Sequence, residues 1–418
     1  MGAEIAENPD FLSTQIITYI GNKRSLIGVI QDEILRIKKE AGLSLCTMAD
    51  LFSGSGIVAR MMKAHASHLT VNDLEQYSYV INSCYLTNKS SFDASRYALL
   101  KQKIEEECAS RTIPGIITQN YAPADENNIT ERDRVFYTRQ NALLIDTYRA
   151  LIDEFVPSGG ESAGVSKGAR VGKSAGAGVV GTRGSAADDV QVAGAGCGNA
   201  AGASGSADMR KFFLAPLITE ASVHTNTSGV FKGFYKDKNG KGCYGGAGKN
   251  ALSRILGKIE LKAPVFSNFE CPFTVLRNDA VALSHELEQT DIVYLDPPYN
   301  QHPYGSNYFM LNTILENKIT APISRVSGIV SNWNHSVFNV KKTALASLEE
   351  IIASLKARYI LVSYNSEGFI TYDEMVSMLK KYGSLSTREV AYNTFRGSRN
   401  LSGRSIHVSE YLFTIKKY

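Results

Sequence analysis

The chain has 418 residues, of which 44% are hydrophobic and 21% are charged, with a formal net charge of +4. This length allows two to three domains, and the composition excludes wholesale disorder and a fibrous repeat. No apolar run is long enough to cross a membrane and the N-terminus does not resemble a signal peptide, so we expect a cytoplasmic protein. The six cysteines lie at least 24 positions apart, so neither a CxxC pair nor a metal site is predicted.

Short apolar runs alternate with segments of helical spacing, which predicts an α/β sheet. In chain order we expect a strand at 47–52, a helix at 57–65, a strand at 69–72, a helix at about 75–85, a strand at 290–295, a helix at 348–356 and a strand at 359–363.

The two halves of this sheet lie far apart in the sequence, which predicts a target-recognition domain inserted between them. We expect residues 1–110 and 271–418 to form the sheet domain and residues 111–270 the inserted domain. Within the latter, residues 158–208 contain 14 Gly, 12 Ala and 7 Ser. Such a segment buries too little apolar surface to offset its chain entropy, so it is predicted to be a disordered insert.

Two glycines follow the first strand in Asp50-Leu51-Phe52-Ser53-Gly54-Ser55-Gly56. Gly54 and Gly56 can adopt positive φ and let a ligand approach the backbone, and the helix N-terminus beyond them offers free N–H groups. Asp73 follows the second strand, where a carboxylate can accept both hydroxyls of a ribose. These features predict a nucleoside cofactor. A glycine turn that binds nothing, and an Asp73 that only caps a helix, stay open as alternatives.

The most specific pattern is Asp296-Pro297-Pro298-Tyr299, directly after the buried run at 290–295. The two prolines fix the backbone and hold Asp296 and Tyr299 in one geometry. At this edge of a sheet, Asp296 and a proline carbonyl can accept hydrogen bonds from an exocyclic amine, and the Tyr299 ring can stack on a planar base. The pattern predicts a site that aligns an amine nitrogen with an electrophile.

These motifs resemble the Dam-like (D12 class) S-adenosylmethionine-dependent, adenine-N6-specific DNA methyltransferases, most often the modification half of a type II restriction–modification system. The segment Tyr19-Ile20-Gly21-Asn22-Lys23-Arg24 is similar to the opening motif of that family, and the motif order matches its alpha arrangement. The resemblance covers most of the chain except residues 158–208. It implies a Rossmann-like methyltransferase sheet with an inserted target-recognition domain, and methylation of double-stranded DNA by base flipping.

Carried over to matching positions, the resemblance implies S-adenosylmethionine as cofactor and a cognate restriction endonuclease that acts separately. Methyl transfer to a neutral amine needs no strong base, so Asp296 is expected to orient the amine. A surface turn is the alternative for Asp279. The implied catalytic residues are Asp296, Pro297, Pro298 and Tyr299, and the implied cofactor-binding residues are Tyr19, Lys23, Phe52, Gly54, Gly56, Asp73 and Asp279.

Residues 210–262 hold ten Lys and Arg against three acidic residues, which predicts a DNA-binding surface. We expect His224, Asn226 and Thr227 to reach base edges. The polar loop at 300–304 is placed to cover the flipped base, although its His302 can equally be a loop residue without chemistry. The predicted DNA contacts are Lys232, Lys236, Arg254, Arg396, Arg399 and Arg404, and a solvated side chain is the alternative for each.

Four other functions share some of these features. A dinucleotide oxidoreductase does not explain Asp296–Tyr299, and a methyltransferase of protein glutamines usually carries Asn in place of Asp296. An RNA adenine-N6 methyltransferase differs only in the polymer that it modifies. A non-catalytic DNA-binding protein with a decayed pocket is the remaining alternative, although both motifs are intact.

Overall fold

The computed structural model describes residues 6–157, 208–393 and 407–418. Residues 1–157 and 209–418 form one compact unit, which is the one described below. The predicted insert therefore lies, apart from Asp208, outside the described residues. The chain on its two sides is held together, because the Arg210 guanidinium donates a hydrogen bond of 2.9 Å to the Val156 carbonyl.

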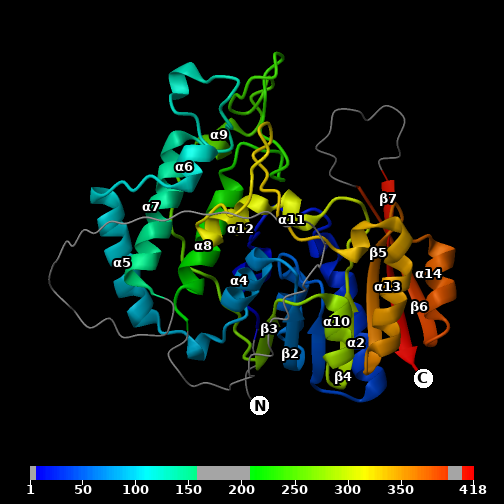
Figure 1. The fold of residues 1–418 in the computed structure, drawn as a ribbon. Helices are drawn as coiled ribbons and strands as arrows, with labels where there is room; N and C mark the ends of the chain where they lie inside the picture. Colours follow the sequence, from blue (N-terminus) through cyan, green and yellow to red (C-terminus); the bar gives the residue numbers. More distant parts are fainter. Residues whose placement is uncertain (1–5, 158–207, 394–406) are drawn as a thin grey trace, which may run out of the picture. The chain divides into compact units, whose positions relative to one another are not determined.

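The unit is built around a seven-stranded sheet in the order β3-β2-β1-β4-β5-β7-β6 (Figure 1). The first five strands run parallel, whereas β7 runs antiparallel to both β5 and β6. This arrangement confirms the predicted Rossmann-like methyltransferase sheet. The strands are β1 (Cys46–Asp50), β2 (Ala66–Asn72), β3 (Phe273–Leu276), β4 (Thr290–Leu295), β5 (Ala357–Asn365), β6 (Gly383–Asn393) and β7 (His407–Lys417).

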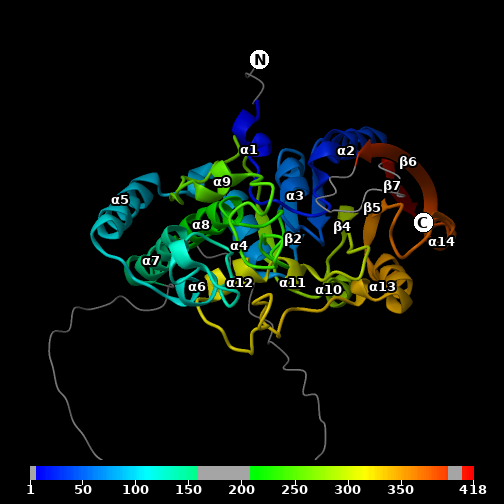
Figure 2. The same cartoon turned by 90° about the horizontal axis from the view of Figure 1, so that it is seen from above.

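Helices cover both faces of the sheet. Figure 2 shows α2 (Ile27–Ala41) and α3 (Ile57–Met62) on one side and α10 (Ala280–Glu286) and α13 (Lys341–Ser354) on the other. The central strands are therefore buried on both faces, which explains the uninterrupted apolar run Ile292-Val293-Tyr294-Leu295 in β4.

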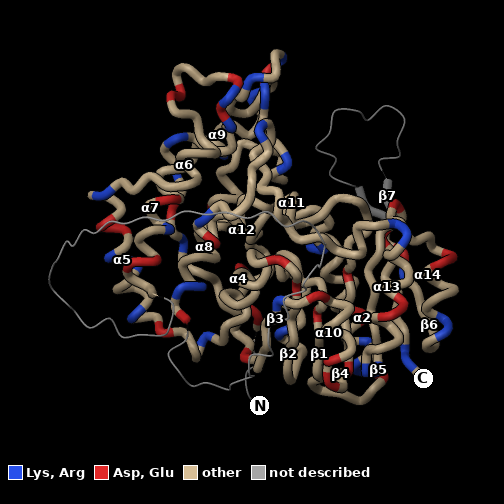
Figure 3. Tube along the Cα trace, in the orientation of Figure 1, with Lys and Arg blue, Asp and Glu red and all other residues tan. Residues whose placement is uncertain are grey.

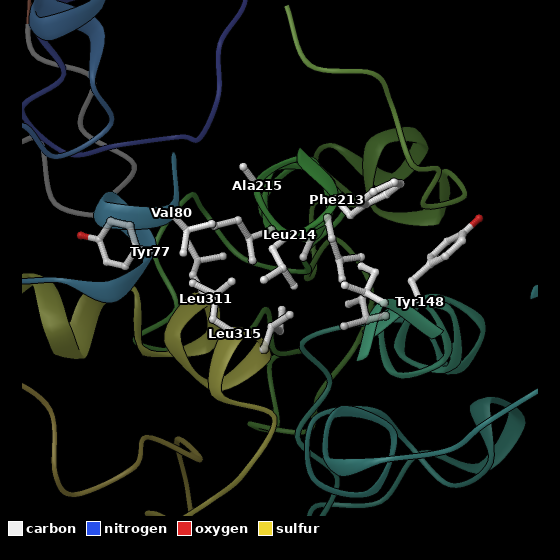
Figure 4. Packing of buried hydrophobic residues seen from close by; sticks show 14 of the residues in the cluster. Tyr77, Val80, Tyr148, Phe213, Leu214, Ala215, Leu311 and Leu315 are labelled. Carbon is white, nitrogen blue, oxygen red and sulfur yellow. The ribbon is translucent and has the colours of Figure 1, made fainter. Parts of the chain in front are cut away.

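A second core is formed by helices beside the sheet. Figure 4 shows Val80 of α4, Phe213 and Leu214 of α8, and Leu311 and Leu315 of α12 packed against one another. Segments from all three predicted chain regions thus share this core. These three helices are α4 (Gln76–Tyr85), α8 (Lys211–Val223) and α12 (Phe309–Glu316).

The other helices are α1 (Pro9–Ser13), α5 (Ala94–Ser110), α6 (Ile116–Asn120), α7 (Arg139–Phe155), α9 (Leu252–Leu256), α11 (Tyr304–Asn307) and α14 (Tyr372–Leu379), with short 3-10 turns at Lys23–Leu26, Lys89–Ser91, Glu126–Asn128 and Val337–Asn339.

Each predicted strand and helix is present; the strand at 290–295 has the predicted ends, and each of the others is shifted at one end or both. The largest shift is in α13, which begins at Lys341 instead of 348. The strands β3, β6 and β7 were not predicted. The four residues of β3 are too few for a clear periodicity, and β6 is an edge strand with many polar residues. Within the described residues, no helix has the length and apolar character needed to span a bilayer.

Candidate active site

The carboxyl ends of β1 and β4 lie side by side in the middle of the sheet. The strand order reverses between them, since β1 is followed by β2 on one side and β4 by β5 on the other. In open α/β sheets, ligands bind at such a switch point. Asp50 is the last residue of β1 and Asp296 directly follows β4, so both carboxylates lie at this position.

A pocket opens at this edge of the sheet, where ligands of α/β proteins bind. Asp296 and Phe52 line the same pocket, as the predicted juxtaposition of catalytic and cofactor motifs requires. The predicted site residues among its lining are Tyr19, Phe52, Asp73, Asp279, Asp296 and Pro298.

The charge of this pocket is acidic. Asp73, Glu75, Asp279 and Asp296 line it, and no described Lys or Arg does. Asp50 is not part of the pocket lining but lies next to it in the chain, before Leu51 and Phe52. Burial and the neighbouring Asp296 raise the pKa of Asp50. Among the described residues, the buried Asp50 Oδ2 has no hydrogen-bond partner of normal geometry. Such surroundings favour a cationic ligand and oppose the phosphates of a dinucleotide.

The glycine turn after β1 has the predicted backbone, with φ of +51° at Gly54 and +77° at Gly56. A Cβ on Gly54 would lie 2.7 Å from the ring of Tyr19, and one on Gly56 would lie 2.4 Å from Oδ1 of Asn82. The turn therefore needs glycine for two reasons. Gly54 lets the opening motif lie against the pocket, and Gly56 lets α4 approach the turn.

Two carboxylates follow β2, and they have different surroundings. Asp73 accepts hydrogen bonds from the backbone N–H of Gly54, at 2.7 Å, and of Glu75, at 2.9 Å, so both of its oxygens hold the turn. Glu75 accepts a hydrogen bond of 2.7 Å from Asn312, and burial together with Asp73 raises the pKa of Glu75 to about 7. Sequence reasoning missed Glu75, although it is only two positions beyond Asp73.

Lys23 occupies a different place from the predicted one. Its ammonium group forms ion pairs with Asp296, at 2.8 Å, and with Glu410 of β7, at 2.9 Å, and Lys23 does not line the pocket described above. Only 5% of Lys23 is exposed, and a buried ammonium group requires nearby counter-charges. The opening motif thus reaches the Asp296 carboxylate, and Glu410 belongs to the same cluster although no sequence motif indicated it.

The electrostatics of this cluster set the charge of Asp296. Burial raises the pKa of Asp296 to about 6, although the ammonium group of Lys23 opposes this increase. Burial lowers the pKa of Lys23, but the carboxylates of Asp296 and Glu410 raise it by more, so the pKa of Lys23 lies above its usual value. Asp296 is therefore a carboxylate at neutral pH and can accept hydrogen bonds.

Aromatic rings gather beside Asp296. A Cβ on Gly21 would lie 3.6 Å from the Tyr299 ring and 3.4 Å from the Tyr304 hydroxyl, so both residues lie next to the opening motif. Tyr19 stacks on Tyr304 and on Tyr308, with ring centroids 5.0 and 4.9 Å apart. Sequence reasoning identified Tyr19 and Tyr299 and included Tyr304 in the polar loop at 300–304, but it missed Tyr308.

Asp279 has a structural role and also lines the pocket. Its Oδ1 accepts hydrogen bonds from the backbone N–H groups of Val281 and Ala282, and so caps α10.

Another part of the pocket lining comes from residues 334–339, which sequence reasoning missed because no motif marks them. There the Phe338 ring contacts the Phe52 ring edge-to-face, with ring centroids 5.3 Å apart. The lining residues in this range are Asn334, Ser336, Phe338 and Asn339.

The expected base-reading residues turn out to be internal. Asn226 is fully buried. Its Nδ2 donates hydrogen bonds to the Val135 and Cys243 carbonyls, and its Oδ1 accepts one from the Gly245 N–H. Thr227 is 1% exposed, and His224 contacts the Arg254 carbonyl through Nδ1. The prediction that these three side chains reach base edges is wrong, because they hold the loop together instead.

The predicted phosphate contacts differ in their surroundings. Arg254 donates hydrogen bonds to the carbonyls of Val223, Thr225 and Thr227, so its guanidinium group supports the loop. Figure 3 shows Lys and Arg gathered along the chain between α8 and α9, which includes the half-buried Lys232 and Lys236. Arg396, Arg399 and Arg404 lie outside the described residues.

Comparisons with known proteins agree with this site. The model of the family described as "D12 class N6 adenine-specific DNA methyltransferase" matches residues 19–149 and 225–378. Type II methyltransferase M.CviAII of Paramecium bursaria Chlorella virus 1 is 28% identical over 96% of this chain and 98% of its own length. Type II methyltransferase M.NlaIII of Neisseria lactamica is 26% identical over 96% and 99%. Type II methyltransferase M.FokI of Planomicrobium okeanokoites is 25% identical over 96% of this chain and 52% of its own length.

Proposed function

Because the chain belongs to the D12 class of N6 adenine-specific DNA methyltransferases, we propose that it transfers the methyl group of S-adenosylmethionine to an adenine swung out of double-stranded DNA. The observation that carries this proposal is the acidic pocket, which Phe52 and Asp296 share at the switch point of the sheet. The similarity to three type II methyltransferases supports a role as the modification half of a restriction–modification system. A cognate restriction endonuclease stays a prediction.

The charge of the pocket and the residues that line it fit S-adenosylmethionine. This cofactor carries a sulfonium and an ammonium group, and it supplies an activated methyl group when bound. Four carboxylates line the pocket, and the unpaired oxygen of Asp50 lies behind it. Phe52 and Phe338 offer apolar ring surface for the adenine of the cofactor, and Glu75 offers a carboxylate for its ribose hydroxyls.

The catalytic motif would then position the substrate amine. Asp296 accepts a hydrogen bond from the N6 amine, and the Tyr299 ring offers a stacking surface for the extruded base. Lys23 holds the Asp296 carboxylate through an ion pair, and Glu410 in turn pairs with Lys23. Orientation of this kind supplies a large share of the rate enhancement, because a neutral amine needs alignment with the methyl group and no strong base.

Expression in a host that lacks DNA methylation tests the proposal. We expect single-molecule sequencing of the host genome to show N6-methyladenine at one short target sequence. The same host carrying the Asp296→Ala variant serves as the control. A genome without modified adenine, or methyl incorporation into RNA alone, would refute the proposed activity.

Glu75 is expected to contribute to cofactor affinity. If its carboxylate accepts ribose hydroxyls, binding favours the ionised form, so the affinity should increase as the pH rises through about 7. Replacing Glu75 by Gln should weaken binding by about tenfold, or about 1.4 kcal/mol, and abolish this pH dependence. Calorimetric titration with S-adenosylmethionine at pH 6 and pH 8 measures both effects.

The exposed Glu286 of α10 provides a matched control, since Glu286→Gln removes the same charge away from the pocket. Equal affinity and equal pH dependence in the Glu75→Gln and wild-type proteins would exclude a ribose contact. A pH dependence that is lost on replacing Asp73 by Asn, with Glu75 intact, would return that role to Asp73.

A further inference from the structure

Two basic side chains from distant parts of the chain meet beside the catalytic motif. Nζ of Lys232 lies 3.0 Å from Nδ1 of His302. Lys232 belongs to the basic region between α8 and α9, whereas His302 lies three positions beyond Tyr299. Residues of the recognition region and of the catalytic loop therefore form one surface spot.

This spot carries positive charge without a counter-ion. Among the described residues, neither Lys232 nor His302 forms an ion pair with a carboxylate. Burial and the adjacent ammonium group lower the pKa of His302, and partial burial lowers the pKa of Lys232. An anion placed against both groups would stabilise their protonated forms.

The backbone on both sides of the contact is fixed. Phe231, which precedes Lys232, is 1% exposed and donates a hydrogen bond of 2.7 Å to the Asn307 carbonyl. The His302 N–H donates to Oδ1 of Asn300 at 2.9 Å, and Asn339 donates to the Asn300 carbonyl at 2.8 Å. The backbone that carries the two basic groups is thus held in place by the fold before any ligand binds.

We propose, on the basis of the proposed function, that Lys232 and His302 together bind the DNA phosphate next to the swung-out adenine. A phosphate oxygen accepts hydrogen bonds from Nζ and from a ring N–H, and its charge supplies the missing counter-ion. A three-residue segment spans at most about 11 Å, so His302 lies within reach of the phosphates of a nucleotide whose base contacts Tyr299. The contact also joins DNA binding to the loop that follows Asp296.

Two single variants, Lys232→Met and His302→Gln, test the phosphate site. Their affinities for a duplex carrying the target found by genome sequencing are measured over a range of salt concentrations. Each variant should bind about tenfold more weakly, and for Lys232→Met, which removes the ammonium charge, the slope of log K against log salt should fall by about one in magnitude. The double variant should lose little more than either single variant, because both residues hold one phosphate. Affinity for S-adenosylmethionine should stay unchanged.

The exposed Lys342 of α13 supplies the control, since Lys342→Met removes the same charge outside the proposed DNA-binding surface. Lys232→Arg should keep near wild-type affinity, which separates loss of charge from misfolding. Wild-type affinity and salt slope in both Lys232→Met and His302→Gln would overturn the proposal.

Replacing single phosphates of the DNA by uncharged methylphosphonates shows which phosphate Lys232 and His302 contact. Duplexes with a methylphosphonate at one position on either side of the target adenine should show one site where the wild-type protein loses about tenfold in affinity. At that site Lys232→Met should lose little further. Equal losses in variant and wild type at every position would overturn the assignment. If the wild-type protein still methylates DNA, that result would leave the proposed function unaffected. A wild-type protein that methylates no DNA would refute the proposed function itself.

Discussion

Replacing Asp296 by Ala is expected to lower methyl transfer by at least about 100-fold, because the N6 amine loses the acceptor that orients it. Cofactor binding should persist, since three other carboxylates still line the pocket. The fold should also persist, because Lys23 keeps its ion pair of 2.9 Å with Glu410. Methyl incorporation into target DNA, measured beside equilibrium binding of S-adenosylmethionine, checks both expectations.

The conservative variant Asp296→Asn sharpens this test. It keeps an acceptor oxygen but loses the charge, so it should retain more activity than Asp296→Ala at equal stability. A rate for Asp296→Ala above a tenth of the wild-type rate would contradict an orienting role. Loss of cofactor affinity in parallel with activity would instead place Asp296 in the cofactor site.

Replacing Lys23 by Met should affect both stability and the pH profile, because it leaves Asp296 and Glu410 as neighbouring buried carboxylates without a cation. We expect a loss of about 3–5 kcal/mol in the free energy of unfolding at neutral pH. Urea unfolding measures this loss. The double variant Lys23→Met/Glu410→Gln removes the excess negative charge and should recover part of it.

The pH profile gives a readout that structural damage alone would not produce. Activity requires ionised Asp296, whose pKa is about 6, so the wild-type rate should fall as the pH drops below that value. Without the ammonium group, the pKa of Asp296 rises and this acid limb moves to higher pH. Lys39→Met on the exposed side of α2 is the control. An acid limb at the wild-type pH in Lys23→Met would mean that Lys23 serves the fold alone.

Local patterns were sufficient to predict the centre of the sheet. The strand β4 is buried on both faces and contains the continuous apolar run 292–295, so the sequence marks it clearly. The edge strand β6 has many exposed polar residues, which hide its pattern. The insertion between the two sheet halves was visible, but the shared core of α4, α8 and α12 depends on contacts across hundreds of positions.

The sequence by itself determined the chemistry that this chain can perform. Proline restricts the backbone of Asp296–Tyr299 wherever it occurs, and the positive φ of Gly54 and Gly56 is a local property of glycine. Only the tertiary structure decided which side chains support that chemistry. It placed Lys23 between Asp296 and Glu410, added Glu75 to the pocket and buried Asn226. Burial and ion pairing depend on partners from distant segments, and no local pattern records them.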